Sequence, residues 1–362
     1  MEQRPGDRSV PWAEAAGLAV ILVIGLVAYL VSRPPEPAPE ATTAIGATDP
    51  GFREQGVVGG GDPLEAEPQE KAGRKDRGAS GKKKGAAATG GLEKPRRIAD
   101  LATLAEANAC VQPEDARLRV ASFNVHSGWN RGRTRLMLPQ LAAEMRRLEA
   151  DVLLLQEVDQ NRPASRRVNQ PAYYAGQLGM GYVFATNVLR PGNSRYGTAV
   201  LSSLPVTEHA NTRLPRPSGT QQRGLLRTVV EVFPGVEVSL YNTHLEHTSE
   251  ATRITQARAI AAVLAQDPHP AVLGGDLNSR PASTAVTTLR SQVADTWPLV
   301  GQGAGLTHPQ VSPRSRIDYV MADPALPALA SYVVPSAVSD HRAVVVDLDL
   351  SGVLAGTVPV CP

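Results

Sequence analysis

Acidic, amide and imidazole side chains recur at the ends of short apolar segments from residue 123 onward. They occur in Phe123-Asn124, Gln156-Glu157, Asn242-Thr243-His244, Gly275-Asp276-Leu277-Asn278, Arg316-Ile317-Asp318-Tyr319 and Ser339-Asp340-His341. Carboxylate and amide oxygens are suitable ligands for Mg²⁺, and histidine is the side chain that carries protons near neutral pH. This combination predicts a hydrolytic metal site.

Two pairs of these residues are suited to binding a metal ion and a phosphate. Glu157 ends an apolar segment, where its carboxylate suits a cation that also binds water and a substrate phosphate. Asn124 ends an earlier segment, and its amide would join the same metal shell or orient Glu157. Asp276 and Asn278 follow two glycines and lie on one side of an extended backbone. Asp276 would hold the attacking water, and Asn278 would donate to a phosphate oxygen.

Two histidines and a third acid suit proton transfer. His244 follows one apolar segment and His341 precedes another. Asp318 lies on a segment of its own, from which its carboxylate would orient His341 and stabilise its charge. Each histidine alone is more often structural than catalytic. The whole set converges only if the strand ends meet at one sheet edge, which is where open α/β sheets bind their ligands.

The segments that carry these residues alternate between strand and helix patterns. Helices are predicted after Pro139 and after Ser249, a candidate cap, and the apolar run 151–155 is typical of a strand buried on both faces. Strands are predicted at 118–123, 151–155, 196–203, 225–233, 236–241, 271–274, 316–321 and 343–350. This order predicts a layered α/β domain with a mixed sheet core.

Taken in order, the motifs resemble those of the endonuclease/exonuclease/phosphatase superfamily. The resemblance rests on Phe123-Asn124-Val125-His126, Leu155-Gln156-Glu157, Tyr196-Gly197-Thr198-Ala199-Val200-Leu201-Ser202, Asn242-Thr243-His244-Leu245, Gly275-Asp276-Leu277-Asn278, Arg316-Ile317-Asp318-Tyr319 and Ser339-Asp340-His341. It implies a four-layered α/β sandwich, with two packed mixed β-sheets flanked by helices, that cleaves phosphoester bonds with Mg²⁺ or Mn²⁺. The motifs are specific for the family but not for a substrate.

The resemblance also implies how the metal and the nucleophile are held. Glu157 would be the principal metal ligand, with Asn124 and Asp340 beside it. Asp276 and Asn278 would position the nucleophile and the phosphate. The implied reaction is in-line attack by water on the phosphorus atom.

The remaining matched positions concern proton transfer and substrate contact. Asp318 and His341 would form the acid–base pair, while His244 would stabilise phosphoryl charge or serve the leaving group. His126 stands where DNA-repair members of the family tend to carry an acid, so a second metal position is in doubt. A histidine at this position resembles the bacterial and lipid-remodelling branch of the family. A hydrogen-bond role behind the site and a direct phosphate contact are both open for His126. Tyr196 is a weaker candidate for phosphate binding.

An uncharged apolar run at 15–32 is close to the roughly 17–25 residues that cross a bilayer. A buried soluble helix would show an amphipathic stripe, and a cleaved signal peptide has a shorter core and an Ala-x-Ala site. An uncleaved signal anchor is therefore preferred. Arg4 and Arg8 precede the run and only Arg33 follows closely, so the short segment 1–14 is predicted to be cytoplasmic. The large domain of this single-pass protein would then lie outside the cell membrane.

The segment 33–109 has the Pro-, Gly- and Lys-rich composition of a disordered linker. It holds all six lysines of the chain, and its basic stretch 71–97 suits either attachment to anionic lipids or polyanions, or a solvated spacer. The catalytic domain is predicted at 110–362, with 23 Arg against 20 Asp plus Glu, a net charge of +3. This charge is far from that of a dedicated nucleic-acid binder.

Cys110 and Cys361 are the only cysteines, and they bracket the predicted domain. One disulfide in an exported domain is expected from this placement, and two unrelated buried thiols are the alternative.

These features predict a membrane-tethered, metal-dependent phosphodiesterase without an obligate protein partner. A nuclease would need a basic groove with aromatic side chains, and Trp129 is the only tryptophan near a motif. The charge of such a groove could come from Arg162, Arg166, Arg167, Arg190, Arg195, Arg213, Arg216 and Arg223. A phospholipid or glycolipid headgroup is favoured by the anchor. The alternative is a non-catalytic tethered binding module, which would have lost a metal or proton-transfer residue, and none is missing.

Overall fold

The computed structural model describes residues 110–112, 115–358 and 360–361. The predicted cytoplasmic segment 1–14, signal anchor 15–32 and linker 33–109 lie outside the described residues. Within the described part, no helix is both long enough and apolar enough to cross a membrane. The anchor therefore stays a prediction.

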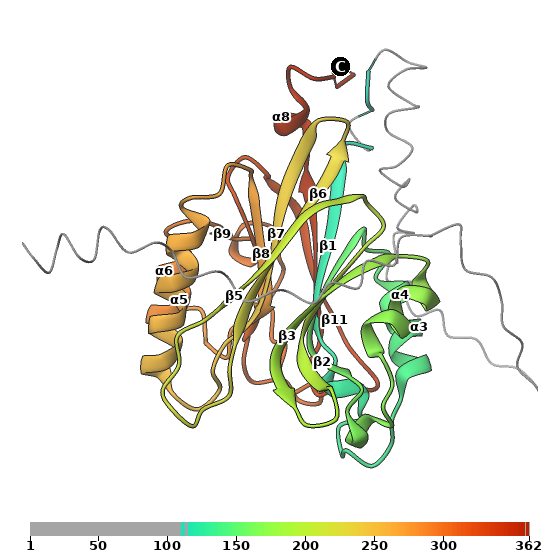
Figure 1. Cartoon of the computed structure of the whole chain (residues 1–362). Coiled ribbons are helices and arrows are strands. Elements are labelled where there is room, and N and C mark those ends of the chain that lie inside the picture. Colours follow the sequence, from blue (N-terminus) through green and yellow to red (C-terminus); the bar gives the residue numbers. More distant parts are fainter. Residues whose placement is uncertain (1–109, 113–114, 359, 362) are drawn as a thin grey trace, which may run out of the picture. The chain divides into compact units, whose positions relative to one another are not determined.

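Two six-stranded mixed sheets form the centre of the described domain (Figure 1). The first has the order β11-β12-β1-β2-β4-β3, with β1 Arg117–Asn124, β2 Val152–Gln160, β3 Gly181–Arg190, β4 Ser194–Ser202, β11 Ala328–Val334 and β12 Ala343–Asp349. The second has the order β5-β6-β7-β8-β10-β9, with β5 Val206–Arg213, β6 Gly224–Phe233, β7 Val236–His244, β8 Ala271–Asp276, β9 Ala294–Asp295 and β10 Asp318–Ala322. The β1–β2 and β7–β8 pairs are parallel, and the other pairs are antiparallel.

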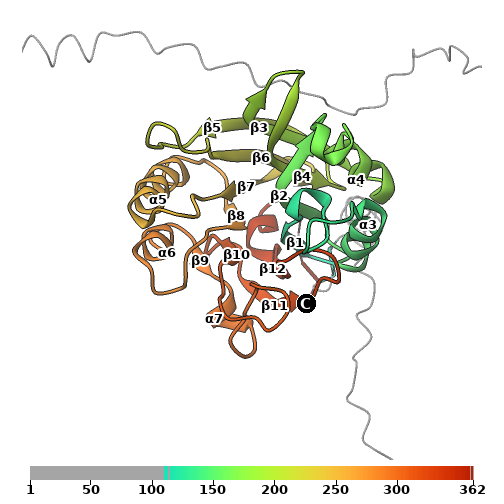
Figure 2. The same cartoon turned by 90° about the horizontal axis from the view of Figure 1, so that it is seen from below.

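Helices cover the outer face of each sheet. Figure 2 shows α3 and α4 outside the first sheet and α5 and α6 outside the second. The helices are α3 Leu138–Arg147, α4 Gln170–Leu178, α5 Glu250–Leu264, α6 Thr284–Leu289, α7 Trp297–Val300, α8 Ser351–Leu354 and the 3-10 turns η2 His126–Gly128 and η3 Pro163–Ser165. The predicted four-layered sandwich is thus confirmed for the described domain.

The apolar run of β2 is explained by burial on both of its faces. Leu154 packs between the two sheets, in the same cluster as Val272 of the second sheet. Leu153 and Leu155 point the other way and belong to the cluster that includes Met145 of α3. Alternate residues of one strand therefore support two hydrophobic layers.

Two helix predictions are confirmed and four strands were missed. The α3 helix carries Pro139 in its first turn, and the Ser249 side chain caps α5 by accepting a hydrogen bond from the Thr252 backbone N–H at 3.2 Å. The strands absent from the sequence prediction, β3, β5, β9 and β11, all lie at sheet edges. Edge strands bury less side-chain surface, so their sequences carry weaker apolar patterns.

The two ends of the described domain are joined. Cys110 and Cys361 form a disulfide with a Cα–Cα distance of 5.1 Å, as expected from their placement. Beside it, Val111 and Val360 pair as a parallel bridge, and the Cys361 backbone N–H donates to the Val111 carbonyl at 2.8 Å.

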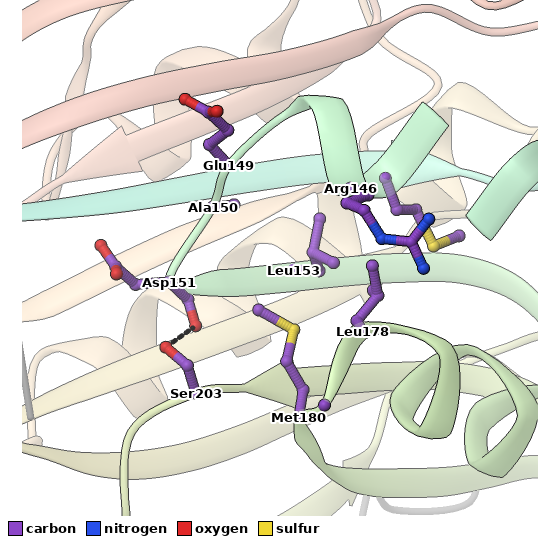
Figure 3. A pocket seen from close by; sticks show the side chains of 10 residues that line it. Arg146, Glu149, Ala150, Asp151, Leu153, Leu178, Met180 and Ser203 are labelled. Atoms are coloured by element: carbon purple, nitrogen blue, oxygen red, sulfur yellow. Dashed lines mark hydrogen bonds between the residues drawn. The ribbon is translucent and has the colours of Figure 1, made fainter. Parts of the chain in front are cut away.

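A cavity of about 300 Å³ lies near the beginning of β2, and the buried Asp151 is one of the residues that line it (Figure 3). One carboxylate oxygen of Asp151 accepts the Arg119 backbone N–H at 2.8 Å, and the Ser203 hydroxyl donates to its backbone carbonyl at 3.2 Å. Burial raises the pKa of the Asp151 carboxyl to about 6. The folded state therefore binds a proton here more tightly than the unfolded chain does.

We expect Asp151→Asn to stabilise the fold in a pH-dependent way. Because the folded pKa is raised, the contribution of the wild-type carboxyl is fully favourable below pH 4 and is lost as the pH rises through about 6. The amide keeps the acceptor for Arg119 and carries no charge, so the variant should gain up to about 2–3 kcal/mol above that pH. Urea unfolding of both proteins at pH about 4 and about 7.5 measures this difference. An equal gain at both pH values would contradict the assignment.

Candidate active site

The register of the strands brings the predicted site residues to one end of the sandwich. Asn124 ends β1, His244 ends β7 and Asp276 ends β8. Asp276 pairs directly with His244 on one side and with Asp318 of β10 on the other. Figure 2 views the domain from the end at which β1, β2, β7 and β8 finish.

Both glycines before Asp276 lie inside β8, which continues to Asp276 and not only to the predicted end at residue 274. A Cβ on Gly274 would lie 2.5 Å from the Leu154 Cδ1 atom of the opposite sheet. A Cβ on Gly275, where φ is +152°, would lie 2.0 Å from the Thr243 carbonyl oxygen. The glycines therefore permit close approach of the backbone, which places Asp276 against its neighbours.

Two buried amides join the sheets beneath the site. The Gln156 side-chain NH₂ donates to the Asn242 Oδ1 atom at 2.9 Å. Asn242 in turn donates to the Leu155 and Ala199 carbonyls at 2.9 and 2.8 Å. Sequence analysis found both residues within motifs but assigned them no role. Their hydrogen bonds fix the first sheet relative to the second where the site residues emerge.

Glu157 is directed into the site by an irregularity in β2. The pairing with β4 shifts register between Leu155 and Val158, and Glu157 has a φ of +56°. Such bulges re-aim a side chain, and this backbone conformation is sparsely populated for a non-glycine residue. The Glu157 carboxylate accepts from the Asn124 amide at 3.3 Å and lies 3.8 Å from an Arg133 guanidinium nitrogen.

The oxygen-rich surroundings of Glu157 fit a hard divalent cation. Its side chain is 19% exposed and lines the same cavity as Asp276. Carboxylate oxygens with open neighbouring positions are what Mg²⁺ and Mn²⁺ bind. Asn124 bridges the two carboxylates by donating to Asp276 at 3.1 Å, while its amide oxygen accepts the His126 backbone N–H at 3.1 Å. Asn124 thus contacts both acids through its NH₂ group.

Asp340 has different neighbours. Its carboxylate lies 3.7 Å from His126 Nδ1 and forms a compact group with the ligand atoms of His308 and His341. Among the described residues, the compact groups of three such side chains do not include Glu157. The role of Asp340 as a metal ligand beside Glu157 stays a prediction.

An acid–base cluster faces Glu157. His341 Nδ1 lies 2.9 Å from the Asp318 carboxylate, and His341 Nε2 lies 3.7 Å from Asp276. Burial lowers the pKa of His341, but Asp318 and Asp276 outweigh it and raise that pKa above its ordinary value. Burial and the nearby Asp318 charge raise the pKa of Asp276. The two buried acids therefore favour the protonated form of His341.

His244, by contrast, is held in its neutral form. Burial, followed by the positive charges of Arg223 and His341, holds the pKa of His244 well below its usual range. Its Nε2 atom lies 3.5 Å from Asp276 Oδ2. The site therefore pairs a charged imidazole with a neutral one, which suits two separate tasks in proton transfer.

Backbone and side-chain contacts hold Asn278 beside Asp276. The Asn278 backbone N–H donates to Asp276 at 2.9 Å, and its amide donates to the Leu245 carbonyl at 3.1 Å. Asn278 adopts a positive φ of 47°, a conformation that asparagine tolerates better than most residues. Its side chain lines the cavity.

These residues share one cavity of about 320 Å³. It is lined by Ser127, Arg133, Glu157, Arg162, Arg190, Tyr196, Gln221, Arg223, His244, His247, Asp276, Asn278 and His341. Of the predicted site residues, Asn124 and Asp318 lie behind the lining and contact it by hydrogen bonds. His126 is also outside the lining: its Nε2 accepts from Arg133 at 2.8 Å. Sequence analysis did not find Arg133, Gln221 or His247, which lie in loops without a motif.

A buried acid on α3 supports the loop that carries Asp340 and His341. The Glu144 carboxylate accepts from the Ser336 hydroxyl at 2.6 Å and from the Ala337 backbone N–H at 2.8 Å. Ser339 continues the chain of contacts, because its hydroxyl donates to the Asn124 carbonyl at 2.7 Å and accepts the His341 N–H at 3.1 Å. Glu144 therefore positions His341 without touching the cavity.

We expect Glu144→Ala to lower kcat by about 10–100-fold with KM little changed, because a small displacement of His341 is costly for catalysis. The variant also leaves buried donors unpaired, at a cost of about 1–3 kcal/mol in unfolding free energy. Glu144→Gln, which keeps one acceptor, should recover part of kcat. Arg147→Ala, an exposed change on the same helix, is the control. Equal kcat values in wild type and Glu144→Ala would contradict the positioning role.

The fold and the site define a phosphoesterase of the four-layered sandwich class. The family model described as endonuclease/exonuclease/phosphatase family matches residues 121–341, and the chain belongs to this family.

Relatives agree with this assignment. The uncharacterized protein YbhP of Escherichia coli K12 is 27% identical over 180 residues, which cover 46% of this chain and 69% of YbhP. The endonuclease/exonuclease/phosphatase of Beutenbergia cavernae is 28% identical, with a TM-score of 0.53 over 65% of this chain and 72% of that one. The mannosyl-6-phosphatase Bt3783 of Bacteroides thetaiotaomicron is 18% identical, with a TM-score of 0.53 over 64% of this chain and 99% of that one. This last likeness shows a shared fold.

Proposed function

We propose that this protein is a Mg²⁺- or Mn²⁺-dependent phosphodiesterase that cleaves its substrate by in-line attack of water. The observation that carries the proposal is the Asp318–His341 pair, at 2.9 Å, whose imidazole lines the same cavity as Glu157, Asp276 and His244. A cavity with a hard-cation ligand on one wall and an acid–base cluster on the other suits phosphoryl transfer.

The cation would be held at Glu157, with Asn124 orienting that carboxylate. When bound, it supplies Lewis-acid polarisation of a phosphoryl oxygen. Asp276 accepts a hydrogen bond from the attacking water and takes its proton, which a raised pKa favours. Asn278 lies beside it and positions the phosphate.

The two histidines act on the charge that develops as the bond to the leaving group breaks. His341, protonated and oriented by Asp318, donates to a phosphoryl oxygen as negative charge accumulates there. His244 is neutral and buried, and its ring N–H donates a hydrogen bond to the leaving-group oxygen, which takes a proton from solvent as the bond to phosphorus breaks. Fixed donors that need no rearrangement lower the barrier most effectively.

The proposed setting is the outer side of the cell membrane, with the domain tethered by residues 15–32. Support comes from the apolar run in the sequence and from the Cys110–Cys361 disulfide, which is typical of exported domains. A tether keeps the domain near phospholipid or glycolipid headgroups, and nucleic acid is the second candidate substrate.

Hydrolysis assays of the full-length protein in detergent test the activity. The substrates are bis-p-nitrophenyl phosphate, plasmid DNA and mixed phospholipid vesicles, each with Mn²⁺ and with EDTA. We expect turnover of at least one substrate that EDTA abolishes. Binding without any metal-dependent turnover would favour the non-catalytic module. Protease access to the domain in intact cells separately tests the outside location, and complete protection would contradict it.

A further inference from the structure

The cavity has a basic wall that the proposed chemistry does not use. Four arginines line it, and two of them have acidic partners: Arg162 binds Asp159 at 2.7 Å, and Arg133 lies 3.8 Å from Glu157. Arg190 and Arg223 make no salt bridge with any described residue. Within the described domain, neither guanidinium therefore has a carboxylate in direct contact, although Arg190 is exposed and the charge of Arg223 acts on the buried Glu246.

Arg223 is the more deeply buried of the two arginines. The residue is only 4% exposed, and its Nε atom is buried without a hydrogen-bond partner. One guanidinium nitrogen lies 3.5 Å from His247 Nδ1, which in turn lies 3.2 Å from the Glu246 carboxylate. Arginine stays protonated in proteins, and a buried N–H donor without a hydrogen-bond partner is unfavourable. Such a group indicates an anionic ligand that completes its surroundings.

These arginines come from other strands than Asp276, Asn278 and His341, although Arg223 is near enough to His244 for its charge to lower the pKa of that histidine. Arg190 ends β3 and Arg223 precedes β6, whereas Asp276, Asn278 and His341 come from the ends of β8 and from the loop before β12. The scissile phosphate already has His341, Asn278 and the cation at Glu157 as partners under the proposed function. The free guanidinium groups are therefore available to a different part of the substrate.

The cavity is poorly suited to a cationic headgroup. Tyr196 is the only Phe, Tyr or Trp side chain in its lining, and the Arg162 guanidinium lies 5.5 Å from its ring centroid. Quaternary ammonium groups are bound by several aromatic faces and repelled by guanidinium groups. The charge of the basic wall instead favours a substrate with an additional negative group.

We propose that Arg223 and Arg190 form a subsite for a phosphomonoester carried by the substrate in addition to its scissile phosphodiester. This inference rests on the proposed function for the identity of the reacting centre. The substrate class is then a phosphodiester of a phosphorylated alcohol, in which arginine binds the second phosphate through charge-assisted hydrogen bonds.

Calorimetric binding of product-like ligands to the full-length protein with Mg²⁺ tests the subsite without requiring turnover. The probes are thymidine 5′-monophosphate and thymidine 3′,5′-bisphosphate, with inositol 1-phosphate and inositol 1,4-bisphosphate as the arm that represents a lipid headgroup. We expect the second phosphate to tighten binding by about 10-fold or more in at least one pair, as charge-assisted hydrogen bonds do. The pair with the larger ratio indicates the source of the phosphomonoester.

Variants assign the effect to Arg223. In Arg223→Gln the ratio within the preferred pair should fall to near one, and in Arg223→Lys part of it should remain. Arg258→Gln, an exposed change on α5, is the matched control and should keep the wild-type ratio. A wild-type ratio near one in both pairs, or an equal loss for both ligands of a pair in Arg223→Gln, would overturn the subsite. Failure of the hydrolysis assays with the binding ratio intact would count against the proposed reaction only.

Discussion

Replacement of His341 by alanine is expected to lower kcat by about 10³-fold, within the range found when a positioned proton donor is removed. The imidazolium is held by Asp318 at 2.9 Å, so the variant loses both a donor to the phosphoryl oxygens and the buried charge that balances Asp318 and Asp276. Initial rates on bis-p-nitrophenyl phosphate with saturating Mn²⁺ measure the loss. Circular dichroism shows whether the variant remains folded.

Asp318→Asn should reproduce most of this loss, because a carboxylate that orients a histidine contributes through that histidine. His209→Ala is the control, since His209 is a partly exposed residue of β5 outside the cavity. An activity of His341→Ala within tenfold of wild type would remove His341 from the mechanism, given the expected range of about 10²–10⁴-fold. In that case the Asp318–His341 pair would be structural.

Glu157→Gln is expected to lower kcat/KM by about 10³-fold or more and to weaken cation binding. Several kcal/mol of transition-state stabilisation depend on the cation, and each 1.4 kcal/mol corresponds to about tenfold in rate. The substitution keeps the size of the side chain and its contact with Asn124 but removes the carboxylate charge. Titration of Mn²⁺ followed by electron paramagnetic resonance measures affinity independently of turnover.

The control for this experiment is Glu208→Gln, which removes an exposed carboxylate of β5 that pairs with Arg227. It should leave both Mn²⁺ affinity and turnover unchanged, because exposed ion pairs contribute little. Wild-type Mn²⁺ affinity in Glu157→Gln would show that the cation is held elsewhere. The group formed by His308, Asp340 and His341 would then be the next candidate.

The sequence allowed the central strands and most of the site to be predicted. β1, β2, β7 and β8 are buried along most of their length, and β2 carries a continuous apolar run, so the polar residues that end these strands are conspicuous. The same logic fails at the sheet edges. β5 carries charged or polar side chains at most positions and is largely exposed, so it has no pattern that separates it from a loop.

The sequence allowed three arginines of the basic wall to be named as candidates, but neither the burial of Arg223 nor the support beneath His341 could be predicted. Arg223 stands among loop residues near Arg213 and Arg216, which are exposed, and only the folded chain shows that Arg223 is buried in the cavity. Glu144 contacts Ser336 and Ala337, which are 192 and 193 residues away. Contacts of this range arise from the pairing of sheets and helices, which no local pattern records.

The disulfide that joins Cys110 to Cys361 lies beside the beginning of β1, where Ala116 accepts a hydrogen bond from Leu350, whereas the cavity lies beyond the end of β1. Eight residues of strand separate these points by about 25 Å. Residue 110, to which the preceding segment is joined, therefore lies at the end of the domain opposite the reacting centre. We expect the length of that segment to determine where the cavity meets its substrate, and we expect the rate of the chemical step to be independent of that length.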